Sequence, residues 1–118
     1  MNPSSLSVEA IVARQLEAYN RQDVDAFVAC FSTDVEIVRE GSNDVQRGRE
    51  TMRQNYAAMF AKFPQNKATV TQRMVVGQHA VDEELVEGRD NPPFRTIAVY
   101  TITAGLISHV RFLSCEDA

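Results

Sequence analysis

Two hydrophobic patterns divide this chain. Up to Pro64, apolar residues mostly recur at the three- and four-residue spacing of amphipathic helices, whereas from Lys67 onward they alternate with polar residues as in half-exposed strands. The patterns predict helices over residues 7–20, 24–31 and 49–63, one early strand over residues 35–40, and later strands over residues 67–76, 79–87, 94–103 and 106–114. Helices followed by a run of strands are typical of an α+β fold.

Short connections join the four later strands. Gly77-Gln78 and Ala104-Gly105 indicate tight turns, and the segment 88–93 is a loop that contains two prolines. Consecutive strands with such links form an antiparallel meander, and a sheet of this size coils around the helices that cover it. We therefore expect a cone-like α+β roll, in which N-terminal helices pack in a curved, mainly antiparallel sheet and enclose a pocket.

Length and composition narrow the class of protein. A chain of 118 residues, 44% hydrophobic and 24% charged, is typical of a single globular domain over residues 1–118. The net charge of −4 and the scattered Lys and Arg residues argue against nucleic-acid binding, which needs a basic face. The sequence shows neither an apolar run of about 18 residues nor a signal peptide, so we expect no membrane contact and a cytoplasmic location.

The sequence contains no motif for a metal or a cofactor. Its two cysteines, Cys30 and Cys115, are far apart, and its two histidines, His79 and His109, are not at metal-binding spacing. We expect Cys30 to be a buried free thiol and Cys115 to be exposed. Neither a Ser-His-Asp arrangement nor a Gly-rich phosphate loop is present, so we predict no metal and no cofactor.

Three segments carry a resemblance to a known family. They are LEAYNRQDVDAFVACFSTDVEIV, GRETMRQNYAAMF and GLISHVRFL. Together they resemble the SnoaL-like and steroid Δ-isomerase-like branch of the nuclear-transport-factor-2-like superfamily, over nearly the whole chain. The resemblance implies a cone-shaped domain with its pocket between helices and sheet, and a homodimer formed through the outer face of the sheet. We expect that outer face to carry the apolar residues Val81, Leu85, Val99 and Ile107.

Ketosteroid isomerases provide the best-known chemistry of this superfamily. They use an Asp base, with a Tyr and a protonated Asp that stabilise the oxyanion. By the resemblance, these positions fall on Arg39, Gln15 and Ala98 in this sequence. An arginine, with a pKa above about 12, takes no proton from carbon at neutral pH, and an alanine donates no hydrogen bond. The sequence therefore argues against that mechanism, although a further Tyr of the family matches Tyr56.

A different set of side chains is expected in the pocket. Alternation along the early strand puts Arg39 on the inner face, and the resemblance puts Asp82 and Glu84 at pocket positions. An inward Arg needs a carboxylate partner, and two neighbouring carboxylates raise the pKa of one of them, which makes it a candidate general acid or base. We predict Asp82 and Glu84 as catalytic residues; the predicted substrate-binding residues are Gln15, Tyr19, Arg39, Tyr56, Tyr100 and Phe112.

Structural roles for the same residues stay open. Asp82 and Glu84 can lie on a solvated strand face, Arg39 can serve in a structural ion pair, and Tyr56 can belong to the core. Two function classes follow. One is an isomerase, cyclase or hydratase that acts on a small apolar substrate by acid–base chemistry. The other is a non-catalytic module that binds a small ligand or forms a dimer, and it predicts a closed network of Arg39 and the carboxylates that leaves no free base.

Overall fold

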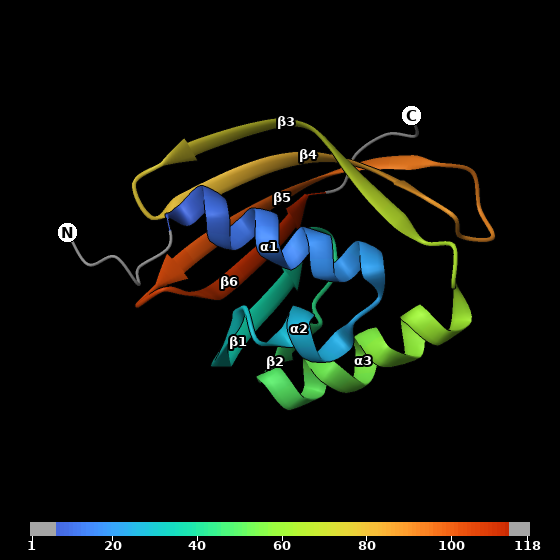
Figure 1. Cartoon of the computed structure of the whole chain (residues 1–118), viewed down its shortest axis with the longest axis horizontal. Helices are drawn as coiled ribbons and strands as arrows, with labels where there is room; N and C mark the ends of the chain where they lie inside the picture. Colours follow the sequence, from blue (N-terminus) through green and yellow to red (C-terminus); the bar gives the residue numbers. More distant parts are fainter. Residues whose placement is uncertain (1–6, 114–118) are drawn as a thin grey trace.

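The computed structural model describes residues 7–113, which form three helices and one six-stranded mixed sheet (Figure 1). The helices are α1 (Val8–Arg21), α2 (Val24–Val28) and α3 (Arg49–Lys62). The strands are β1 (Phe31–Arg39), β2 (Val45–Arg47), β3 (Lys67–Val76), β4 (His79–Glu87), β5 (Phe94–Thr103) and β6 (Leu106–Leu113). Cys115, predicted to be exposed, and Ser114, the predicted end of the last strand, lie outside the described residues.

Helix α1 forms where the sequence predicts it and lies against the curved sheet (Figure 1). Ser7 caps its N-terminus, where the side-chain Oγ accepts a hydrogen bond from the Ala10 N–H at 3.1 Å. The buried face of the helix consists of Ile11, Val12, Gln15 and Ala18. A polar side chain is thus buried among apolar ones, which requires that it find a hydrogen-bond partner in the sheet.

Helix α2 is shorter than predicted. It ends at Val28 rather than at residue 31, and Phe31 instead opens β1. There Phe31 pairs with Ile107 of β6, whose N–H donates to the Cys30 carbonyl at 2.9 Å. Phe31 is only 2% exposed as a strand residue, so the chain gains ladder hydrogen bonds while this ring stays buried. Cys30 is a buried free thiol, as predicted.

The strand order across the sheet is β2-β1-β6-β5-β4-β3. The predicted meander of β3 to β6 is confirmed, since each of these strands pairs antiparallel with the next. Strand β1 joins the meander by pairing parallel with β6, and the short β2 adds an antiparallel edge that the sequence analysis missed. The arrangement is the expected α+β roll with a curved sheet that does not close (Figure 1).

Register shifts decide which side chains face the helices. Shifts lie on both sides of β6, one of them between Thr101 and Ile102 of β5, and Ile107 is fully buried in the core. The prediction that Ile107 lies on the outer face is therefore wrong, because a bulge reverses the alternation on which it rested. A second bulge, between Val70 and Gln72, adds one residue to β3 and brings Arg73 opposite Asp82 of β4.

The core fills the space between the helices and the concave face of the sheet. Its largest fully buried side chains come from both layers: Phe31, Met52, Ile107, Val12, Val28, Val35 and Val110. Helix α1 contacts β3, β4 and β6, whereas α3 contacts β1 and β2. The helices thus cover different halves of the sheet.

Candidate functional site

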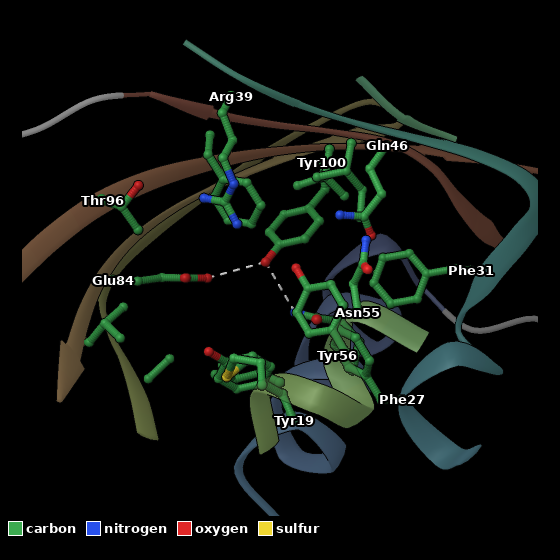
Figure 2. A pocket seen from close by; sticks show the side chains of 18 of the residues that line it. Tyr19, Phe27, Phe31, Arg39, Gln46, Asn55, Tyr56, Glu84, Thr96 and Tyr100 are labelled. Carbon is green, nitrogen blue, oxygen red and sulfur yellow. Dashed lines mark hydrogen bonds between the residues drawn. The ribbon is translucent and has the colours of Figure 1, made fainter. Parts of the chain in front are cut away.

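A cavity of about 180 Å³ lies between the sheet and helices α1 and α3 (Figure 2). The apolar part of its wall includes Leu16, Phe27, Ile37, Met59, Val86, Phe94 and Phe112. Glu84 lines the cavity, and so do all the residues predicted to bind substrate: Gln15, Tyr19, Arg39, Tyr56, Tyr100 and Phe112. Asp82 does not line it. The predicted substrate-binding side chains thus line one cavity, and their roles stay predictions.

Glu84 is held by a chain of hydrogen bonds that begins on α1. Gln15 Nε2 donates to Tyr100 Oη at 3.2 Å, and Tyr100 Oη donates to Glu84 Oε2 at 3.1 Å (Figure 2). All three side chains are buried, with Glu84 6% exposed. The only hydrogen bond to the Glu84 carboxyl from residues 7–113 is the one from Tyr100, which leaves Oε1 available to a ligand.

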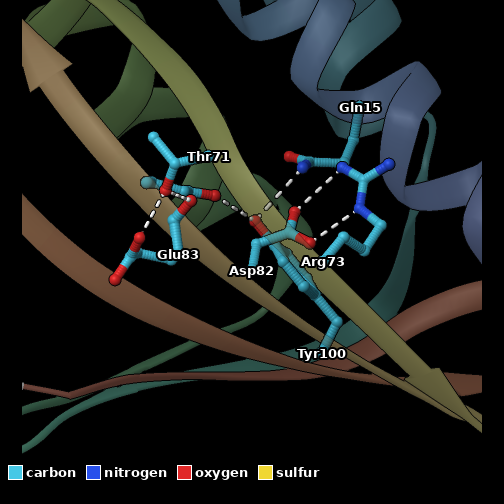
Figure 3. A network of polar contacts seen from close by, with 7 residues as sticks. Gln15, Thr71, Arg73, Asp82, Glu83 and Tyr100 are labelled. Atoms are coloured by element: carbon cyan, nitrogen blue, oxygen red, sulfur yellow. Dashed lines mark hydrogen bonds and ion pairs between the residues drawn. The ribbon is translucent and has the colours of Figure 1, made fainter.

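Asp82 has a different environment from Glu84, although both side chains are on the inner face of β4. Asp82 is fully buried and accepts two hydrogen bonds from Arg73, from Nε to Oδ1 at 2.7 Å and from Nη2 to Oδ2 at 2.9 Å (Figure 3). Such a fork-to-fork pair engages both carboxylate oxygens of Asp82 in charge-assisted hydrogen bonds. Asp82 is thus committed to a structural ion pair.

Burial and a neighbouring charge raise the pKa of Glu84 to about 7. The largest cause is desolvation of the carboxylate, and the charge of Asp82 adds to it. The hydrogen bond from Tyr100 and the charge of Arg73 act in the opposite direction without cancelling the rise. The pKa of Tyr100 is raised well above 10 by burial and by Glu84, so its hydroxyl keeps its proton and serves as a donor.

The structure corrects one predicted cluster. Arg39 forms no ion pair with Asp82 or Glu84; its guanidinium lies over the Phe112 ring, 4.7 Å from the ring centre. Arg39 and Asp82 share one cross-strand row, but three strand spacings separate them, or about 14 Å of sheet. Arg73, on the strand next to Asp82, takes the place predicted for Arg39.

A second arginine is fixed at another part of the cavity wall. Arg89 donates from Nε to Asn66 Oδ1 at 2.8 Å and from Nη2 to Tyr19 Oη at 3.3 Å, and its guanidinium lies 5.4 Å from the Phe94 ring centre. Asn66 is 2% exposed and also donates to Tyr19 Oη at 2.7 Å. Tyr19 is therefore part of a fixed polar cluster.

A hydroxyl and an amide oxygen are among the polar groups of the cavity that have no hydrogen-bond partner within residues 7–113. One is the hydroxyl of Tyr56, whose ring packs against Phe27 with the ring centres 4.8 Å apart. Burial raises the pKa of Tyr56 to about 12, so this hydroxyl stays a donor at neutral pH. The other is the buried Oε1 of Gln46 on β2. A ligand in the cavity can accept a hydrogen bond from the Tyr56 hydroxyl.

Sequence reasoning missed several residues of the site. Arg73 was missed because the bulge in β3 interrupts the alternation from which the inner and outer faces of the strand were predicted. Arg89 lies in a loop, and Gln46 lies in a three-residue strand, so neither belongs to a periodic pattern. Arg73 could have been found by asking which cation pairs with Asp82, because a buried carboxylate needs a cationic partner and β3 is the neighbouring strand.

The described part of the chain offers no group of three or more His, Cys, Asp or Glu side chains that could hold a metal ion. Within the same residues, no helix is long and apolar enough to cross a membrane.

A model of the SnoaL-like domain family matches residues 12–110 of this chain. Among solved structures, an uncharacterized cystatin-fold protein from Novosphingobium aromaticivorans is similar with a TM-score of 0.85 and 31% identity, covering 92% of this chain and 99% of its own. An LEH-like epoxide hydrolase from M. tuberculosis has a TM-score of 0.81 and 18% identity, covering 94% and 84% of the two chains.

An NTF2-like protein from Cytophaga hutchinsonii is similar with a TM-score of 0.79 and 12% identity, over 94% of this chain and 92% of that one. At such identities, the likeness to these last two proteins extends to the fold alone. No curated protein matches the sequence.

Proposed function

Because this chain belongs to the SnoaL-like domain family, we propose that its cavity is an active site in which Glu84 moves a proton on a small, mainly apolar substrate. One observation carries the proposal. Glu84 is a buried carboxyl on the cavity wall, with no cation in contact and one oxygen free of hydrogen bonds from residues 7–113. A carboxyl in such a place can exchange a proton with a ligand near neutral pH.

The pKa of about 7 supports both halves of an acid–base cycle. At neutral pH, the ionised form can take a proton from a carbon next to a carbonyl group, and the protonated form can return it to another atom. Tyr100 holds the carboxyl in position. The Tyr56 hydroxyl, which has no partner in the described chain, can donate to the oxygen on which negative charge develops.

The alternative, a non-catalytic binding module, predicts that ion pairs consume every carboxylate. Arg73 and Asp82 form such a closed pair, but Glu84 is outside it. A free buried carboxyl on a ligand-sized cavity therefore favours the enzyme over the binder.

The direct test is proton exchange at carbon. The protein is incubated in D2O with a panel of small ketones and a Δ5-3-ketosteroid, and loss of the α-proton signal is followed by NMR. We expect exchange with at least one member, and we expect Glu84→Gln to slow it by about 10²–10⁴-fold, the usual contribution of a general base.

The matched control is Glu83→Gln, the same change at the next residue. Its side chain lies on the other face of β4 and accepts a hydrogen bond from Thr71 (Figure 3). It is expected to exchange protons at the wild-type rate. Ligand binding without any exchange, or exchange that survives Glu84→Gln, would instead support the binding module or a different catalytic group.

A further inference from the structure

The charges on the cavity wall are opposite in sign to those of the whole chain. The chain has a net charge of −4, yet the charged lining residues are two arginines, Arg39 and Arg89, and one carboxyl, Glu84. Neither arginine forms an ion pair within residues 7–113, and neither is among the causes that shift the pKa of Glu84. The wall therefore has a net positive charge even when Glu84 is ionised, and a larger one when Glu84 is protonated.

The two arginines differ in how many of their N–H donors are already engaged. Arg89 already donates from two nitrogens to Asn66 and Tyr19. The Arg39 guanidinium makes no hydrogen bond to residues 7–113 and lies over the Phe112 ring, 4.7 Å from the ring centre. Stacking on the ring holds the guanidinium plane in place and leaves the N–H groups along its edge without partners. A guanidinium in this state can bind a carboxylate through two parallel hydrogen bonds.

Figure 2 shows where that edge points. The Arg39 side chain extends from β1 into the cavity on the side where Glu84 and Tyr100 lie. The ring that supports Arg39 is itself a lining residue, so an anion bound there would have apolar wall beside it.

We propose that the substrates of this site are small organic acids, held by a two-hydrogen-bond contact between their carboxylate and Arg39, with the apolar body of the molecule against Phe112 and its reactive carbon toward Glu84. The inference names the substrate class and rests on the proposed function above. We favour a carboxylate over a phosphate because the free group is a single planar guanidinium, that of Arg39, and no second cation contacts this guanidinium.

The test compares carboxylic acids with their own amides, which have nearly the same shape and no charge. The probes are benzoate and benzamide, 3-phenylpropanoate and 3-phenylpropanamide, and hexanoate and hexanamide. Affinities are measured by NMR titration of the whole chain at about pH 6, where the acids are ionised. We expect at least one acid to bind 10-fold or more tightly than its amide. Equal affinity within every pair, or no binding by any acid, overturns the inference.

Substitutions of Arg39 test whether this side chain causes the preference for acids over amides. Arg39→Gln is expected to reduce the acid-over-amide preference to within about 2-fold, and Arg39→Lys to leave an intermediate value because it keeps charge without the fork. The control is Arg95→Gln, which removes the same charge from the outer face of β5, where its neighbour on β4 is Leu85. A preference that survives Arg39→Gln, or that Arg95→Gln abolishes equally, overturns the inference.

Glu84→Gln separates this inference from the proposed function. It is expected to abolish proton exchange and to keep the preference for acids. If the chain prefers acids through Arg39 but exchanges no proton, the inference stands and the proposed function fails. If Glu84 exchanges protons of neutral ketones and no acid is preferred, the proposed function stands and the inference fails.

Discussion

Asp82 and Glu84 lie two residues apart on β4, but the side chains that contact them differ. Asp82 has an arginine across the β3–β4 ladder, and both its oxygens are engaged. Glu84 has a neutral tyrosine instead, so its burial is not compensated by a contacting cation. The residue type is similar at both positions, but the contacting side chains make Asp82 part of an ion pair and leave Glu84 a buried carboxyl with a raised pKa.

Titration of Glu84 makes the stability of the fold depend on pH. Its pKa is about 7 in the folded state against an ordinary 4.5, so the folded state keeps this proton to higher pH than the unfolded chain does. The contribution is fully present below about pH 4.5 and is lost as pH rises to 7, and it amounts to about 3 kcal/mol. The difference in unfolding free energy between wild type and Glu84→Gln, measured by urea denaturation, should fall by that amount. A difference that is flat across this window would contradict the raised pKa.

Regular alternation and the family resemblance were the two sources from which the sequence could predict a side chain's position. The resemblance implied that Asp82 and Glu84 face inward, and they do, with Ala80 and Val86 on either side of them. Arg73 could not be assigned, because one extra residue in β3 shifts its face, and a bulge depends on strand pairing rather than on local composition. The closeness of the two carboxylates predicted a raised pKa for one of them, but the burial that is the largest cause of the rise at Glu84 depends on neighbours in three dimensions.

At the scale of elements, long periodic segments were predictable and short ones were not. Helices α1 and α3 and the four meander strands appear within a residue or two of their predicted ends. Strand β2 was missed because three residues cannot show an alternation. The end of α2 was misplaced because Phe31 continues a helical apolar pattern, while its pairing with Ile107 is a contact between distant parts of the chain.

The loop after β4 depends on a glycine that approaches another chain segment closely. Gly88 has φ +87°, and a Cβ there would lie 1.9 Å from the Gln65 carbonyl oxygen. We expect Gly88→Ala to cost at least ~3 kcal/mol of unfolding free energy, because both the backbone conformation and the contact oppose a side chain. Thermal and urea unfolding measure the loss.

Gly105→Ala is the matched control for this glycine. Gly105 also has a positive φ, of +81°, but a Cβ would meet nothing within 4 Å. Its substitution should cost only the backbone strain, about 1–2 kcal/mol. If both variants are equally stable, the close approach of Gly88 to Gln65 does not contribute.

At the scale of the whole molecule, the outer face of the sheet carries an apolar row. Met74, Val81 and Val99 are cross-strand neighbours on β3, β4 and β5, on the face opposite Asp82. Met74 is 59% exposed, whereas Val81 and Val99 are partly buried. The predicted dimer through the outer face requires an apolar row of this kind. Ile107, which was predicted to belong to it, is buried in the core instead.

The dimer stays a prediction with a simple measurement. Sedimentation equilibrium should give twice the chain mass for the wild type, and Val99→Glu should convert the protein to a monomer, because it buries a charge in the predicted interface. Val75→Glu is the control, since Val75 pairs with Ala80 and lies on the other face of β3 at 40% exposure. A wild-type monomer, or a dimer that tolerates Val99→Glu, would rule out this interface.

The bulge in β3 has a consequence for the history of the chain. Ala68 and Arg73 are an odd number of positions apart yet face the same side, because the ladder skips one residue between Val70 and Gln72. Loss of the single codon for Thr71 would leave Arg73 opposite Asp82 and remove the bulge together with the hydrogen bonds from Thr71 to Glu83. A gapless alignment with a descendant lacking that codon would set Gln72 against its arginine, and the ion pair would look lost although both genes encode it.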